Sequence, residues 1–186
     1  MREKFPHLPE RISGLAEIAY NLWWSWHPAA RMLFKRLDRI AWKESRHNPV
    51  RMLIEIPSEV LTAASQQDEY LEHYDAVMAR FREDMHTKIC WFAAHVREPS
   101  CQPVAFFSAE YGLHHSLPFY AGGLGFLAGD YIKECSDLGV PLVGVGFAYP
   151  GGYLRQKIRT DGWQDDIHEA FQSDAAPIER VVDDAG

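Results

Sequence analysis

The sequence has few cysteines, no excess of positive charge and no long apolar run. Its three cysteines, Cys90, Cys101 and Cys135, form no Cys-x-x-Cys pair. Together with the lack of a secretory signal, this indicates a reducing compartment. The 19 basic residues are outnumbered by 26 acidic ones, giving a net charge of −7, which argues against nucleic acid or an anionic membrane as the main partner. No run of about 18 apolar residues is present to span a membrane. We therefore predict a cytoplasmic protein that binds neither nucleic acid nor membrane.

Familiar metal and nucleotide motifs are also missing. There is no His-Glu-x-x-His, and the adjacent His114 and His115 cannot easily face one ion from a regular element, so we predict no metal site. The glycines at 123, 125 and 129 are spaced G-x-G-x-x-x-G, which differs from the dinucleotide fingerprint, and no Gly-Lys-Ser/Thr follows as in a P-loop. Dinucleotide binding is therefore disfavoured.

The first half of the chain has helical periodicity. With 47% hydrophobic residues among 186, the chain is able to bury a core. Apolar residues recur at three- and four-residue spacing from Pro9 to Trp26 and from about Gln67 to Ala94, which predicts a helix over each range. Trp23, Trp24 and Trp26 have two interpretations, a sugar-stacking surface or a core of packed rings. The apolar stripe favours the core.

The pattern changes in the second half, and we predict three segments. Residues 1–95 form a helical leader domain, and 96–103, with two prolines, form a linker. Residues 104–186 form an incomplete Rossmann-like domain, which gives an α/β fold class.

Within the third segment, the order of elements predicts a βαβ unit. Short apolar runs at 104–107 and 142–147 are typical of buried strands, and 124–138 is a one-sided helix that Gly139 ends. Strand, helix and strand predict a right-handed unit with parallel strands. Residues 177–182 are interpreted as a further strand, followed by a turn with no returning strand.

One segment, residues 107–129, carries most of the functional information. An apolar run ends in Glu110, and after a turn-rich stretch Gly122-Gly123-Leu124-Gly125 opens the predicted helix. Glycines at a helix start let a ligand approach the backbone, and the amides there favour an anion. This predicts a site for a phosphate or a phosphorylated sugar. The alternative is that the glycines only allow close packing of helix and strand, and the loop alone does not decide between the two.

Four motifs in one order resemble a known family. They are Phe-Ser-Ala-Glu-Tyr-Gly at 107–112, Leu-Pro-Phe-Tyr-Ala-Gly-Gly-Leu-Gly with Leu-Ala-Gly-Asp at 117–130, Ser-Asp-Leu-Gly-Val-Pro-Leu-Val-Gly-Val-Gly at 136–146, and Tyr-Leu-Arg-Gln-Lys-Ile with Asp-Gly-Trp-Gln at 153–164. They are similar to the first Rossmann-like domain of the α-glucan (glycogen, starch, maltodextrin) phosphorylases. Asn-Leu-Trp-Trp-Ser-Trp at 21–26 is similar to the leader domain of the bacterial and archaeal branch.

The resemblance implies a glycosyltransferase with two Rossmann-like domains facing a cleft (GT-B type). It implies phosphorolysis of an α-1,4-glucan or maltodextrin by inorganic phosphate to glucose 1-phosphate, with pyridoxal phosphate as a Schiff base, and it leaves a homo-oligomer open. By the same match, Gly122, Gly123, Leu124 and Gly125 face substrate and phosphate. Glu110 positions them, the alternative being a carboxylate at the strand end that only caps nearby amides, and Tyr111 lies beside Glu110 near the cofactor.

Some features of the family are not carried over. Gln156, Lys157, Trp163 and Gln164 match and are interpreted as support for the loop. Phe126 replaces an Arg often found after the glycine loop, so no role of that Arg is transferred.

The family's cofactor lysine has no counterpart here, since neither Lys133 nor Lys157 lies in its motif, and no catalytic residue is assigned. We therefore predict an N-terminal phosphorylase fragment that is inactive alone. Two alternatives stay open, a fragment of a nucleotide-sugar-dependent glucan synthase and a non-catalytic glucan-binding module.

Overall fold

The computed structural model describes residues 4–86, 90–96, 102–149, 151, 155–167 and 171–181. These residues divide into two compact units. The first contains residues 4–86 together with 172–181, and the second contains the described residues between 90 and 171. The predicted segment 104–186 is thus shared between the units. The predicted linker at 96–103 lies mostly outside the described residues, and the domain assignment stays a prediction.

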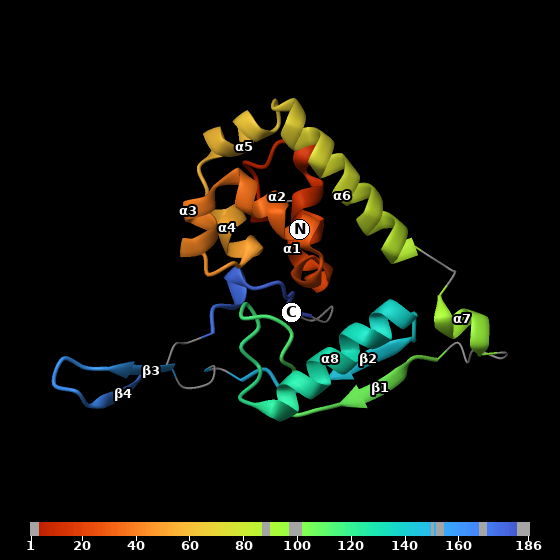
Figure 1. The fold of residues 1–186 in the computed structure, drawn as a ribbon, viewed down its shortest axis with the longest axis vertical. Coiled ribbons are helices and arrows are strands. Elements are labelled where there is room, and N and C mark those ends of the chain that lie inside the picture. Colours follow the sequence, from red (N-terminus) through yellow and green to blue (C-terminus); the bar gives the residue numbers. More distant parts are fainter. Residues whose placement is uncertain are drawn as a thin grey trace. The chain divides into compact units, whose positions relative to one another are not determined.

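The first unit is helical (Figure 1). Its longer helices are α2 (Pro28–Leu37) and α6 (Asp68–His86). The short elements are η2 (Glu10–Ile12), α1 (Gly14–Tyr20), η3 (Leu22–Trp26), α3 (Arg39–Glu44), α4 (Pro49–Glu55), α5 (Ser58–Ala64) and η4 (Ser173–Ala175). Polar side chains begin several of them, as expected for helix N-caps. Asp38 accepts hydrogen bonds from the amides of Ile40 and Ala41 at the start of α3, and Asn48 accepts one from Arg51 at the start of α4.

The core of this unit is aromatic. Trp24 is 1% exposed, and its ring meets the rings of Phe34 and Trp42 edge-on at 6.1 and 5.8 Å. Trp23 is 4% exposed. The interpretation of Trp23 and Trp24 as core residues is confirmed, because rings this buried cannot stack on a sugar from solvent.

Two predicted helices are wrong in extent. The range 9–26 is divided into η2, α1 and η3, because Asn21 is extended (φ −101°, ψ 116°) and its side chain caps η3 by accepting from Trp23 N. The helix predicted over 67–94 is longer than the observed α6, which covers Asp68–His86. Cys90 is again extended (φ −125°, ψ 165°) and precedes a separate helix, α7 (Trp91–His95), in the second unit.

The second unit contains the predicted βαβ arrangement. Strand β1 (Val104–Phe107) pairs in parallel with β2 (Leu142–Val145), with Val104 opposite Leu142 and Phe107 opposite Val145. Helix α8 (Gly123–Leu138) connects the two strands and lies along them (Figure 1). Gly139 ends the helix at φ 70°, a left-handed conformation that glycine adopts without strain. The predicted order of elements and the helix end are confirmed, although β2 ends at Val145 and not at residue 147. The predicted burial of the strands is wrong, because most residues of β1 and β2 are exposed in this two-stranded sheet. Leu124, Leu127 and Tyr131 of α8 are likewise more than half exposed.

The remaining strands form a hairpin. β3 (Arg155–Ile158) and β4 (Gln164–Ile167) pair antiparallel, with Lys157 opposite Asp165. The described chain is thus mostly helical with a few short strands. The predicted strand over 177–182 is wrong for its described residues, 177–181, which form no strand. The chain bends at 176–177, and the amide of Ile178 donates to the carbonyl of Ala176. These residues belong to the helical first unit, so they pack with helices and do not pair in a sheet. The predicted turn at 183–186 lies outside the described residues.

Within the described part of the chain, no helix has the length and apolar character needed to cross a membrane. The cytoplasmic location stays a prediction.

Candidate functional site

The loop of interest begins at the end of β1 and leads into α8. Gly122 is the N-cap residue of this 16-residue helix, and Gly123 is its first helical residue. Gly122, Gly123 and Leu124 are exposed, whereas Gly125 is buried. The helix therefore presents its first residues to solvent and buries Gly125, Ala128, Gly129 and Cys135 further along.

A carboxylate of the same chain lies at this helix start. Glu110 Oε2 accepts hydrogen bonds from the amides of Ala121 at 3.0 Å and Gly122 at 3.4 Å. The Ala121 amide is the main reason that the pKa of Glu110 falls below its ordinary value. Desolvation opposes this shift, and the amides of Gly122 and Gly125 add to it. Negative charge at a helix N-terminus is favourable, so Glu110 fixes the loop in place.

The glycines of the loop have different roles. A Cβ at Gly125 would lie 2.5 Å from Tyr120 Cβ, and one at Gly129 would collide with the carbonyl of Gly112. A Cβ at Gly122 or Gly123 would meet nothing within 4 Å. The packing explanation therefore accounts for Gly125 and Gly129 but not for Gly122 and Gly123.

Tyr111 lies beside Glu110 and connects the two parallel strands. Its hydroxyl donates to the carbonyl of Phe106 on β1, and the carbonyl of Val145 on β2 is 3.3 Å away. Its ring packs against Gly144 and Gly146, where a Cβ would lie within 3.3 Å and 2.8 Å of it. These contacts give Tyr111 a role in joining the strands, and its predicted proximity to a cofactor stays a prediction.

The other matched residues lie further along the chain. Gln156, Lys157, Trp163 and Gln164 lie on or beside the β3–β4 hairpin and are exposed. Phe126 is 55% exposed and packs edge-on against Tyr120, with the ring centroids 5.3 Å apart.

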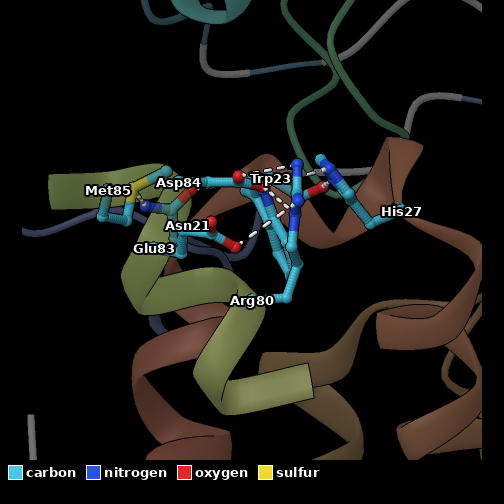
Figure 2. A network of polar contacts seen from close by, with 7 residues as sticks. All are labelled: Asn21, Trp23, His27, Arg80, Glu83, Asp84 and Met85. Carbon is cyan, nitrogen blue, oxygen red and sulfur yellow. Dashed lines mark hydrogen bonds and ion pairs between the residues drawn. The ribbon is translucent and has the colours of Figure 1, made fainter. Parts of the chain in front are cut away.

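A polar network at the end of α6 was not anticipated from the sequence. Asp84 Oδ2 accepts a 2.9 Å hydrogen bond from Trp23 Nε1 and lies 3.6 Å from His27 Nε2, while Arg80 reaches Asp84 Oδ1 at 3.0 Å (Figure 2). His27 stacks on Trp23 at 3.9 Å, and its Nδ1 lies 2.7 Å from the Trp23 carbonyl. Since a carbonyl only accepts, Nδ1 carries the proton. The network joins η3 to α6. The sequence offered only its local spacings, such as the i,i+4 pair of Arg80 and Asp84, and not the contact of Trp23 with Asp84 across 61 residues.

The comparisons with known proteins agree with the motifs. A family model described as "Protein of unknown function (DUF3417)" matches residues 8–117. A protein of Aquifex aeolicus named glycogen phosphorylase is 44% identical over 93% of this chain and 24% of its own length. A maltodextrin phosphorylase of Thermococcus litoralis is 39% identical over 96% of the chain, and a glycogen phosphorylase of Mycobacterium tuberculosis is 35% identical over 97%, each over 21% of its own length.

The chain thus spans between a fifth and a quarter of the length of these relatives. No solved structure matches it significantly. The chain is homologous to the N-terminal region of bacterial and archaeal glycogen and maltodextrin phosphorylases, and it belongs to the DUF3417 family.

Proposed function

We propose that the chain is the N-terminal portion of an α-1,4-glucan phosphorylase, which cleaves a glucan with inorganic phosphate to release glucose 1-phosphate. In this proposal the second unit is the start of a Rossmann-like domain. Support comes from the names of the relatives that match nearly the whole chain and from the order of the four motifs.

The observation that carries the proposal is the open glycine pair at the start of α8. Gly122 and Gly123 leave space where any side chain would project, and the amides of a helix's first turn point outward toward an anion. In the proposed reaction, the amides of Gly123 and Leu124 bind oxygens of the phosphate or of the glucosyl group, because the amides of Ala121 and Gly122 already donate to Glu110. Donors held in place before the reaction stabilise developing charge without reorganisation. Glu110 keeps the loop in the binding shape through Ala121 and Gly122.

Pyridoxal phosphate, which the resemblance implies, does not fit the described residues. A Schiff base requires a lysine directed into an enclosed site. Lys133 lies 3.8 Å from Asp130 on the same helix, and Lys157 is exposed on the hairpin. Neither lysine is placed to hold the cofactor, so we assign no step through it to this chain.

The isolated chain is therefore proposed to be inactive. Its loop supplies one wall of a site, and the second wall belongs to the part of the relatives that this chain does not span. The partners proposed for the complete protein are an α-1,4-glucan, inorganic phosphate and glucose 1-phosphate.

Two measurements on the isolated chain test the proposal. Incubation with maltodextrin and phosphate should release no glucose 1-phosphate, and sustained release would show that the chain is complete in itself. Titration with inorganic phosphate, followed by ¹⁵N–¹H NMR, should shift the amide signals of Gly123 and Leu124. The variant Gly123→Ala places a methyl group on the open face and should reduce these shifts. Shifts with ADP-glucose but none with phosphate would favour the synthase alternative, and no shift with either ligand would remove the anion-binding role.

A further inference from the structure

The helical first unit contains a hollow formed by η2, α1 and α6. Its volume is about 490 Å³, and small-ligand sites usually have volumes of about 300–1,000 Å³. The polar part of its lining includes Arg11, Glu17, Tyr74, Asp75 and Arg82. All of these residues belong to the first unit, whereas the glycine loop belongs to the second. The hollow is thus a place for a small ligand that the glycine loop does not bind.

Gly14 positions a hydroxyl group in the lining of this hollow. A Cβ at Gly14 would lie 2.5 Å from the hydroxyl oxygen of Tyr74 and 2.7 Å from Cε of Met78. Because glycine has no side chain, Tyr74 occupies that space, and its hydroxyl oxygen accepts a 2.9 Å hydrogen bond from the Gly14 amide. The start of α1 therefore holds the Tyr74 hydroxyl in one place.

The proton of this hydroxyl is still to be donated. Tyr74 is only 6% exposed, and this burial raises the pKa of its hydroxyl, so the group keeps its proton at neutral pH. Since its oxygen accepts from Gly14, the proton points away from that amide. No described residue accepts it in a hydrogen bond. Leaving a buried donor unsatisfied is unfavourable, so an oxygen of a molecule in the hollow is the acceptor that Tyr74 requires.

An ion pair beside Tyr74 offers donors and acceptors together. Arg11 Nη1 and Nη2 donate to Oδ1 and Oδ2 of Asp75 at 2.8 and 2.6 Å, and the Arg11 guanidinium lies 5.8 Å from the centre of the Tyr74 ring. The guanidinium has further N–H groups and the carboxylate further lone pairs, and the two side chains are 45% and 57% exposed. Adjacent hydroxyls of a sugar match such a pair, because each hydroxyl both donates and accepts.

The charge of the lining favours a neutral ligand. The carboxylates of Glu10, Glu17 and Asp75 outnumber the guanidinium groups of Arg11 and Arg82, so an anion such as phosphate meets net repulsion. In the described part of the chain, the side chains of Glu17 and Arg82 form no hydrogen bond or ion pair with another residue. They add one acceptor group and one donor group for a ligand with hydroxyls.

We propose that this hollow is a carbohydrate site, which binds a neutral oligosaccharide through the Tyr74 hydroxyl and the Arg11–Asp75 pair. A sugar oxygen accepts the Tyr74 proton, and two adjacent hydroxyls bind Arg11 and Asp75. The choice of an α-1,4-glucan as the oligosaccharide rests on the proposed function. The first unit thereby binds the polymer itself, while the glycine loop of the second unit binds phosphate or the glucosyl group.

Titration of the whole chain with maltotriose, followed by ¹⁵N–¹H NMR, tests the site. The amide signals of residues 10–17 and 74–82 should shift. The signals of Gly123 and Leu124 report separately on inorganic phosphate, so failure of this site and failure of the proposed function are distinguishable. No shift at 10–17 and 74–82 with maltotriose, or a shift there with phosphate alone, would overturn the carbohydrate site.

Two variants in separate exposed ion pairs test the role of Arg11. Arg11→Gln removes the charged donor and should weaken maltotriose binding about tenfold. The control Arg51→Gln breaks the pair of Arg51 with Glu55, which are 2.8 Å apart and do not line the hollow, and it should leave the affinity unchanged. Equal affinities of the Arg11→Gln variant and the unaltered chain would contradict the proposal.

A further variant fills the hollow without removing a hydrogen bond. Ala79 lines the hollow and is exposed, so Ala79→Leu is compatible with the fold and should weaken maltotriose binding about tenfold by occupying the space of the sugar. Ala76→Leu, at an exposed position of α6 outside the lining, is the matched control and should bind like the unaltered chain. Undiminished binding by the Ala79→Leu variant would place the sugar elsewhere.

Discussion

The carboxylate of Glu110 and the amide of Ala121 are joined by a 3.0 Å hydrogen bond that closes the loop between β1 and α8. Glu110 thereby supplies negative charge at the start of α8 from within the chain, next to the open residues Gly122 and Gly123. The contact orders the backbone of the loop and leaves the outer face of the first turn accessible.

The Glu110 contact predicts a pH dependence. Because the amides of Ala121 and Gly122 favour the charged form, the pKa of Glu110 lies below its ordinary 4.5. Folding then gains stability from this group above about pH 4.5, and the gain is lost as the pH falls through the lowered pKa of the folded state. A ¹³C NMR titration of the Glu110 carboxyl should show the lowered pKa, and Glu110→Gln should abolish the pH-dependent shift of the Ala121 amide. A carboxyl pKa at or above 4.5 would contradict the observed geometry.

Two glycines of α8 should respond oppositely to alanine. Gly129→Ala drives a methyl group into the backbone carbonyl of Gly112, which cannot move aside like a side chain. A loss of about 1–3 kcal/mol is expected. Gly123→Ala places its methyl group in open space and should be neutral or stabilising by up to about 1 kcal/mol. Protection of the α8 amides against hydrogen exchange is the measurement, and equal effects of the two changes would refute the distinction.

The network at the end of α6 predicts a coupling between Trp23 and Asp84. Trp23→Phe keeps an aromatic ring but removes the Nε1 donor to Asp84 and part of a buried indole. The first unit should lose about 1–2 kcal/mol from the hydrogen bond, since the acceptor is a partly buried charge, and more from the cavity that the smaller ring leaves. In an Asp84→Ala background the same substitution should have a smaller effect. Chemical denaturation of the four proteins measures the cycle, and additive effects would show that the hydrogen bond does not contribute.

The strained turn before α4 predicts a stabilising substitution. Arg46 has φ 56°, a conformation that costs a residue with a Cβ roughly 1–2 kcal/mol and glycine little. Arg46→Gly should therefore be more stable than Arg46→Ala by about 1 kcal/mol. Comparison with alanine removes the contribution of the arginine side chain from the measurement. Equal midpoints of thermal unfolding for the two variants would show that the turn is not strained in solution.

Local signals predicted the elements of the βαβ part and their order correctly, but not the exposure of its strands. The short apolar runs of β1 and β2, the one-sided pattern of α8 and Gly139 after its end are all visible within a few residues. The errors arose where distant residues decide. The chain just before the bend at 176–177 is held by Asn48, which donates to the carbonyl of Ala175 from 127 residues away. The end of α6 is tied to Trp23, which is 61 residues from Asp84.

The candidate site was also predictable only where local sequence signals define it. Its position at a helix start follows from the spacing of glycines after Glu110. The spacing does not tell which glycines have room for a side chain. Tertiary contacts decide this, because Tyr120 fills the space beside Gly125 and the Gly112 backbone fills the space beside Gly129. The contact of Glu110 with Ala121, 11 residues away, likewise required the folded loop.

The distance between Asn48 and Ala175 along the chain also has a consequence for biosynthesis. As the polypeptide emerges from the ribosome, the helices up to His86 appear well before the residues that complete their packing. Until the whole second unit has been translated, the nascent helical unit lacks Ala175, which accepts from Asn48, and Pro177, which lines a groove with Tyr20 and Phe81. A chaperone that shields apolar surface on nascent chains is therefore expected to act on this interval, and ribosome-bound chains halted before and after residue 181 should differ in their resistance to protease.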